Sequence, residues 1–161
     1  MRRLLLLPLL ILAVSCGSGG SEGPSASVTT PPTTAAATVE QQVEAAYLRS
    51  WDVYAKAVRT LDPSGLEESY VGKALETVSG EVRRRQSERR PAAVKVDHDL
   101  SIEIVNDTTA VVVDRYVNHS VRLDPTDSTP LESDPNERIT ESYNLILDEA
   151  RWKVSGIVRQ R

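Results

Sequence analysis

The chain has 161 residues, of which 40% are hydrophobic and 26% charged, and a net charge of −4 at pH 7. An acidic balance argues against general nucleic-acid binding, because that function needs a basic face. The single cysteine has no partner for a disulfide within the chain. Its sequence context therefore decides what its thiol does.

The first residues have the three parts of a secretory signal. Arg2 and Arg3 give a positive start, an apolar run extends from Leu4 to Val14, and small residues follow it. The run is shorter than the about 20 apolar residues that a membrane-spanning helix needs. We therefore predict a signal peptide over residues 1–15 and export of the remainder.

The segment Ala13-Val14-Ser15-Cys16 closes this signal. Small residues directly before a cysteine resemble the lipobox of bacterial lipoproteins, although Ala13 stands where leucine is usual and Leu12 comes one step earlier. The resemblance implies that Cys16 becomes the first mature residue and carries fatty acyl chains such as palmitate. Two or more chains anchor a protein stably, so we expect it on the extracytoplasmic side of the cell membrane. The alternative is an ordinary signal peptide that leaves Cys16 as a free thiol.

Residues 16–38 consist mainly of Gly, Ser, Thr, Pro and Ala, with Glu22 as the one charge. Such a segment has too little apolar surface to offset the entropy of ordering. We predict a flexible tether here, which holds a domain away from the membrane. Residues 39–161 then have the size of one ordinary domain.

Helices are predicted in the first part of this domain. Thr38 is a suitable N-cap with a capping-box partner at Gln41, and Pro63 ends the helix that follows. A short helix is predicted over residues 66–70 and a third over 72–90. The first helix is amphipathic, because its apolar residues recur at helical spacing: Val43, Tyr47, Trp51, Tyr54, Val58 and Leu61.

After Pro91 the apolar period changes to two, which is typical of strands. We predict strands over residues 94–105, 108–123, 137–148 and 152–160, with a loop over 124–136 because of its turn-forming residues. Helices followed by an antiparallel meander predict an α+β fold. On the second strand, the more apolar side is expected to face the helices: Val111, Val113, Val117, Val121 and Leu123.

The aromatic first helix "YLRSWDVYAKAV" and the closing hairpin "ESYNLILDEARWKVSGIV" resemble the nuclear transport factor 2-like superfamily. The resemblance implies a curved antiparallel sheet wrapped around the N-terminal helices, which makes a cone with a pocket. Members of the superfamily include ketosteroid isomerases, dehydratases, transport adaptors and many actinobacterial envelope lipoproteins. Fold alone therefore does not decide the function.

The enzymatic hypothesis uses Asp114 with Tyr116 or His119. A carboxylate in an apolar pocket beside a phenol could remove a proton next to a carbonyl, as an isomerase does. Asp114 and Tyr116 share one strand face and His119 lies on the other. If the valine-rich side faces the helices, Asp114 and Tyr116 lie on the outer face as ordinary polar residues. His98, between two aspartates, is expected at a solvated strand edge.

The binding hypothesis uses Tyr47, Trp51 and Tyr54, the aromatic residues of the first helix. They are either packed core residues or the rim of an apolar cavity that takes a small molecule. The arginines of "VRRRQSERR" (82–90) form either a solvated helix end or a contact with anionic lipid headgroups.

We predict no cofactor and no metal site. The acidic residues of the 124–136 loop and its neighbour do not match the spacing of a calcium loop: Asp124, Asp127, Glu132, Asp134 and Glu137.

The hypothesis we favour is a membrane-anchored envelope lipoprotein whose domain binds a protein partner or an apolar small molecule without catalysis. The alternatives are an isomerase or dehydratase-like enzyme and a domain that forms a homodimer through its open sheet.

Overall fold

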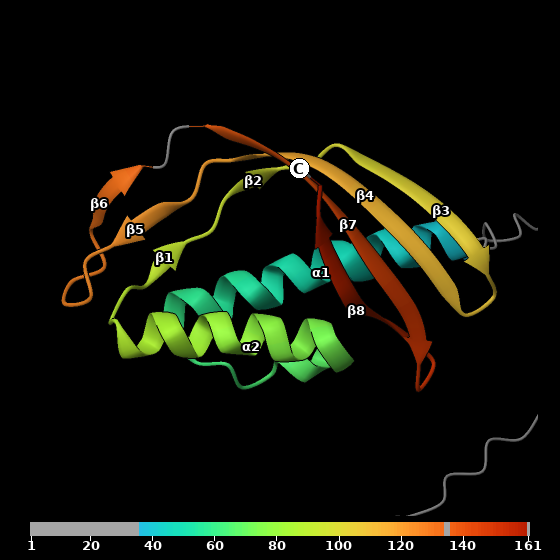
Figure 1. The fold of residues 1–161 in the computed structure, drawn as a ribbon, viewed down its shortest axis with the longest axis horizontal. Coiled ribbons are helices and arrows are strands. Elements are labelled where there is room, and N and C mark those ends of the chain that lie inside the picture. The colour runs from blue at the N-terminus through green and yellow to red at the C-terminus, as the bar shows by residue number, and fades with distance from the viewer. Residues whose placement is uncertain (1–35, 134–135, 161) are drawn as a thin grey trace, which may run out of the picture. The chain divides into compact units, whose positions relative to one another are not determined.

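The computed structural model describes residues 36–133 and 136–160. The predicted signal peptide, Cys16 and nearly all of the predicted tether lie outside these residues. Two α-helices, α1 (Val39–Thr60) and α2 (Gly72–Ser87), lie against one side of a curved antiparallel sheet (Figure 1). The predicted α+β fold, with N-terminal helices on a curved sheet, is confirmed.

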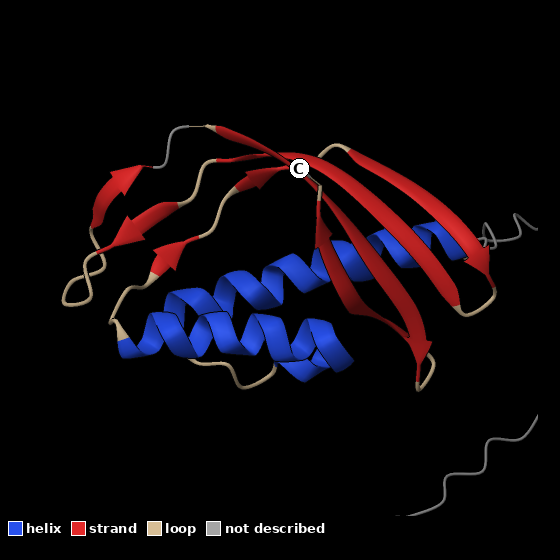
Figure 2. Ribbon diagram, viewed as in Figure 1, coloured by secondary structure: helices blue, strands red, loops and turns tan. Residues whose placement is uncertain are grey.

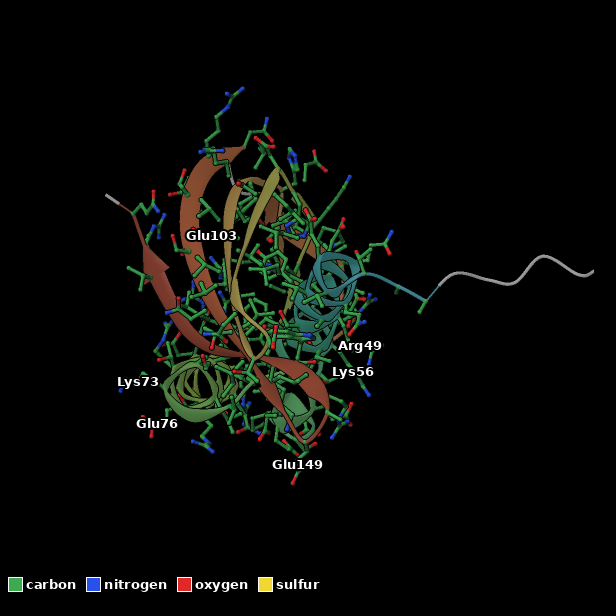
Figure 3. All side chains as sticks on the ribbon, turned by 90° about the vertical axis from the view of Figure 1, so that its right-hand side faces the viewer. Arg49, Lys56, Lys73, Glu76, Glu103 and Glu149 are labelled. Carbon is green, nitrogen blue, oxygen red and sulfur yellow. The ribbon has the colours of Figure 1, made fainter. Side chains whose placement is uncertain are left out.

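Helix α1 begins as its sequence predicts. The Thr38 side chain accepts a hydrogen bond from the Gln41 backbone N–H, and the Gln41 side chain accepts one from the Thr38 N–H, so both parts of the capping box are present. The helix ends at Leu61, in the left-handed conformation (φ 56°), before Pro63. Arg49 and Lys56, labelled in Figure 3, are exposed on the solvent side of α1.

A short 3₁₀ helix, η1 (Leu66–Glu68), and Tyr70 connect α1 to α2. Tyr70 forms a parallel bridge with Val154. The Val154 N–H donates to the Ser69 carbonyl, and the Val71 N–H donates to the Val154 carbonyl, both at 2.9 Å. Since Val154 lies on the last strand, this connection covers part of that strand's free edge.

The larger sheet is built on two long central strands, β4 (Thr109–Asn118) and β7 (Glu137–Asp148), paired antiparallel along the whole of β4. Strand β8 (Arg151–Arg159) pairs with β7 at one edge, with a register shift between Asn144 and Leu145. Strands β2 (Val96–Asp97) and β3 (Leu100–Asn106) pair with the other side of β4. Figure 2 shows these strands arching over the helices.

Strands β2 and β3 form one bent strand. Val96 pairs with Asn118 and Leu100 pairs with Asp114, so the register is the same on both sides of the break. The break falls at His98 and Asp99, where the sequence predicts an unbroken strand. The reason is that the Asp99 backbone N–H turns to donate to the Asp114 carboxylate at 3.1 Å.

The prediction that the valine-rich face of β4 points towards the helices is wrong. The side chains that face the helices are those of Ala110, Val112, Asp114 and Tyr116, each at most 5% exposed. The valines 111, 113 and 117 are on the outer face and only half-buried. The number of valines does not identify the inner face of β4, because the inward residues include small and polar ones. Their burial depends on partners in α1 and β7.

The predicted strand over 108–123 ends at Asn118. Its last part is a separate strand, β5 (Val121–Leu123), in a small second sheet with β1 (Ala92–Ala93) and β6 (Pro130–Ser133). The loop predicted over 124–136 is therefore wrong in part, because β6 lies within it and pairs with β5. A proline is tolerated at the first residue of a strand.

The core lies between the helices and the inner face of the sheet, where buried residues of α1, α2, β4, β7 and β8 pack together. Among its largest fully buried side chains are Tyr47, Leu66 and Leu145. In the described part of the chain, no helix is both long and apolar enough to cross a membrane.

Two glycines of α2 give a paired stability prediction. Gly80 lies within the helix at ordinary φ, whereas Gly72 begins it at φ +55°, and an added Cβ meets no atom within 4 Å at either. Gly80→Ala is expected to stabilise the protein by about 1 kcal/mol through helix propensity. Gly72→Ala is expected to destabilise it by ~1 kcal/mol, because a side chain disfavours left-handed backbone. Urea unfolding followed by tryptophan fluorescence measures both; changes of the same sign would contradict the backbone assignment.

Candidate functional site

A cavity of about 340 Å³ opens between the helices and the sheet. The chain has two tryptophans and five tyrosines, and five of these aromatic side chains line the cavity. Its other walls come from α2, the 92–96 segment, β5 and the inner face of β7 and β8. The aromatic lining residues are Trp51, Tyr54, Tyr70, Tyr116 and Tyr143.

Trp51 forms one wall of the cavity, and hydrogen bonds to buried residues fix its indole ring. Its indole Nε1–H donates to the Tyr47 hydroxyl at 2.7 Å, and the Tyr47 hydroxyl donates to Asp114 Oδ2 at 2.7 Å. Tyr47 is completely buried and does not line the cavity. Of the three aromatic residues predicted on the first helix, Trp51 and Tyr54 therefore border the cavity and Tyr47 is part of the core.

Asp114 is completely buried, and its carboxylate is contacted by two segments, α1 and the break between β2 and β3. Tyr47 and His98 Nδ1 both contact Oδ2, at 2.7 and 2.5 Å, and the Asp99 N–H donates to Oδ1. Because a buried carboxylate is costly unless donors compensate it, these contacts fix α1 against the bent strand. The carboxylate is engaged within the fold and does not line the cavity.

His98 differs from its expected place at a solvated strand edge. Its side chain is only 19% exposed, and its ring lies edge-on to Trp51 and Tyr47, with centroids 5.3 and 5.9 Å apart. The alternation through Leu100 predicts this inward direction, because residues two apart on a strand share a face. His98 does not line the cavity.

The cavity contains a carboxylate that was not among the residues singled out from the sequence. Glu141 Oε2 accepts hydrogen bonds from the Tyr116 hydroxyl at 3.0 Å and the Tyr143 hydroxyl at 2.6 Å. A period of two from Leu145 through Tyr143 places Glu141 on the inner face of β7. That alternation is the sequence pattern from which Glu141 could have been predicted as a residue of the inner face.

The other charged groups of the cavity are arranged in pairs at its rim. Arg85 Nε lies 2.9 Å from Glu81 Oε1, which also accepts a hydrogen bond from the Tyr54 hydroxyl. Arg159 lies opposite Glu141 in the β7–β8 ladder, but its guanidinium pairs with Glu137 at 2.8 Å. The lining of the cavity thus combines aromatic rings with charged groups.

The residues of the enzymatic hypothesis are not brought together. The Tyr116 hydroxyl binds Glu141 in the cavity, while Asp114 is engaged with Tyr47 and His98. His119 lies outside both groups, with Nε2 2.9 Å from Asp97 Oδ2. Asp114, Tyr116 and His119 therefore have three different sets of partners.

The arginine-rich end of α2 is largely engaged in local ion pairs. Arg84 and Arg90 both approach Glu88, at 3.4 and 3.0 Å, and Arg85 pairs with Glu81. Within residues 36–133 and 136–160 there is no group of three or more potential ligands that could hold a metal ion. Asp134 and the side chain of Glu132 lie outside the described part of the chain.

All five tyrosines of the chain have a raised pKa. The main cause at each is burial, which disfavours the charged phenolate. At Tyr143 and Tyr116 the negative charge of Glu141 contributes further, and at Tyr54 that of Glu81 does the same. The hydroxyls thus remain hydrogen-bond donors in the folded protein.

No family model matches the sequence, and no curated protein matches it. Similarity is found among solved structures. The intermembrane space region of the chloroplast protein ARC6 aligns with a TM-score of 0.57 at 14% identity, over 77% of this chain and 98% of that one. The protein Aln2 from a Streptomyces species aligns with a TM-score of 0.52 at 12% identity, over 73% and 89%.

A domain of unknown function from Nostoc punctiforme, described as having a cystatin-like fold, aligns with a TM-score of 0.51 at 11% identity, over 74% of this chain and 76% of that one. At such identities the likeness concerns the fold alone. The fold of the domain is thus a cystatin-like α+β fold, with helices packed on a curved antiparallel sheet.

The tyrosine environments predict the response of the protein to alkali. Unfolded tyrosines lose their protons near pH ~10, whereas the folded protein retains them, so stability falls as pH rises above that value. We expect tyrosinate absorbance to appear only together with loss of the far-ultraviolet circular dichroism signal. Reversible ionisation of a tyrosine near pH ~10 in a protein that stays folded would contradict this.

Proposed function

We propose that the protein is an envelope lipoprotein, anchored through Cys16, whose domain binds a small molecule in the aromatic cavity without catalysis. The observation that carries the binding part is the cavity itself, about 340 Å³ and lined by five aromatic side chains. Pockets for small molecules are typically concave and aromatic, with a few placed polar groups. Here the polar groups are Glu141 and the charged pairs of the rim.

The arrangement of the acidic side chains favours binding over catalysis. A general base must reach the proton that it removes. Asp114, the base of the enzymatic alternative, is completely buried and accepts three hydrogen bonds from within the fold. An isomerase or dehydratase that uses Asp114 with Tyr116 or His119 is therefore the less supported alternative.

The charged groups of the lining change the expected character of the ligand. The sequence predicts an apolar ligand, but Glu81, Arg85, Glu141 and Arg159 also line the cavity. A molecule with both apolar and polar parts fits such a lining better than a purely apolar one, because a purely apolar molecule would cover these charged groups without giving them a polar contact. The alternatives are a protein partner bound to the outer surface and a homodimer formed through the open sheet.

Occupancy of the cavity is tested by native mass spectrometry of the protein purified gently from its own kind of cell. We expect a bound small molecule. Val96→Trp, which adds an indole at the cavity wall, should abolish the bound mass. Val113→Trp places the same indole on the outer face of β4 and should preserve it. A bare wild-type mass, or equal occupancy in both variants, would argue against binding in this cavity.

Anchoring is tested separately. In the native host we expect the protein in the detergent phase, with an N-terminal peptide that begins at Cys16 and carries acyl chains. Cys16→Ser should move the protein to the aqueous phase, because the thiol is the acylation site, whereas Ser18→Ala should leave it anchored. An aqueous wild-type protein with an unmodified thiol would show that the sequence is an ordinary signal peptide.

A further inference from the structure

The carboxylate of Glu141 stands apart from the other charges of the cavity. Its described hydrogen-bond partners are the Tyr116 and Tyr143 hydroxyls, both on Oε2. These are neutral donors, so they orient the carboxylate and leave its charge in place. None of the described ion pairs includes Glu141.

The cationic side chains around the cavity already have partners. Arg85 pairs with Glu81 at 2.9 Å and Arg159 with Glu137 at 2.8 Å. Arg122 is also engaged in an interaction. Arg159 lies nearest along the ladder, directly opposite Glu141, yet its guanidinium is directed to Glu137. Among the charged groups of the lining, Glu141 thus differs from Glu81, Arg85 and Arg159, each of which has a described ion pair.

Aromatic rings surround this carboxylate. Tyr116 and Tyr143 bind it directly, and Trp51 lies 5.2 Å from the Tyr116 ring and 6.4 Å from the Tyr143 ring, between centroids. The Tyr54 ring lies 5.9 Å from that of Trp51, between centroids. The faces of such rings attract cations, most strongly where water is excluded, as in the aromatic cages that hold quaternary ammonium groups.

We propose that the cavity binds a ligand with a positively charged nitrogen, such as an alkylammonium group, which lies against the aromatic wall with Glu141 as its counter-ion. This inference rests on the proposed function and names the ligand class for the same cavity. A cation gains charge attraction from both the carboxylate and the ring faces, whereas a neutral molecule of the same shape gains only packing and neutral hydrogen bonds. An anion is repelled by Glu141.

The experiment compares three probes of nearly the same shape: choline, its neutral isostere 3,3-dimethylbutan-1-ol, and the anion 3,3-dimethylbutanoate. Binding to the full-length protein is followed by NMR through the indole N–H signals of its two tryptophans. Trp51 lines the cavity and Trp152 does not, so the Trp152 signal is an internal control. We expect choline to shift the Trp51 signal with an affinity at least about tenfold above that of either other probe.

Glu141→Gln removes the charge and keeps an oxygen that can accept from the two tyrosines. It is expected to weaken choline binding about tenfold and to leave the neutral isostere unaffected. The matched control is Glu103→Gln. Glu103, labelled in Figure 3, is exposed on β3, so this variant changes the net charge equally and should bind choline like the wild type.

The inference is overturned if the isostere or the anion binds as tightly as choline, or if Glu141→Gln binds choline unchanged. In that case a small molecule found by native mass spectrometry still supports the cavity as a binding site, and only its ligand class is wrong. Failure of all three probes also overturns the inference. If Glu141→Gln does not fold, the comparison of probes on the wild type decides it.

Discussion

The burial of the Asp114 carboxylate is the constraint on which the arrangement of this domain depends. A carboxyl group without exposure to solvent must find its hydrogen-bond partners within the protein. The donors here are the Tyr47 hydroxyl from α1, His98 and the Asp99 backbone. They bring the first helix and the bent β2–β3 strand to one point of β4. The bend of the β2–β3 strand, the position of α1 against the sheet and the position of the Trp51 indole all follow from this contact.

The cavity is therefore a product of the same network that closes the fold. Trp51 donates its indole hydrogen to Tyr47 and presents the rest of its ring to the cavity. On the opposite wall, Glu141 holds Tyr116 and Tyr143 through their hydroxyls. Two carboxylates thus organise the interior. Asp114 is compensated within the protein, and Glu141 faces the space where a ligand would lie.

Much of the fold could be predicted from the sequence, because local rules determine it. The Thr38–Gln41 capping box, the proline after α1 and the period of two in β7 each depend on a few neighbouring residues. The facing of β4 could not be predicted in this way, since the choice between its valines and the row with Asp114 depends on partners distant in the chain. The inward positions of His98 and Glu141 could be predicted, because the alternation of their own strands places both on the inner face.

Trp51 stands between the network of Asp114 and the cavity, and this has an evolutionary consequence. Substitutions at Tyr54, Tyr116 or Glu141 alter the chemistry of the cavity on one side of the indole, while the donors of Asp114 on its other side are left in place. Selection can then act on ligand preference through residues that make no hydrogen bond to Asp114. A lineage that keeps the buried network is free to exchange the cavity wall, which offers one route by which a single scaffold of helices on a curved sheet acquires different ligands in different descendants.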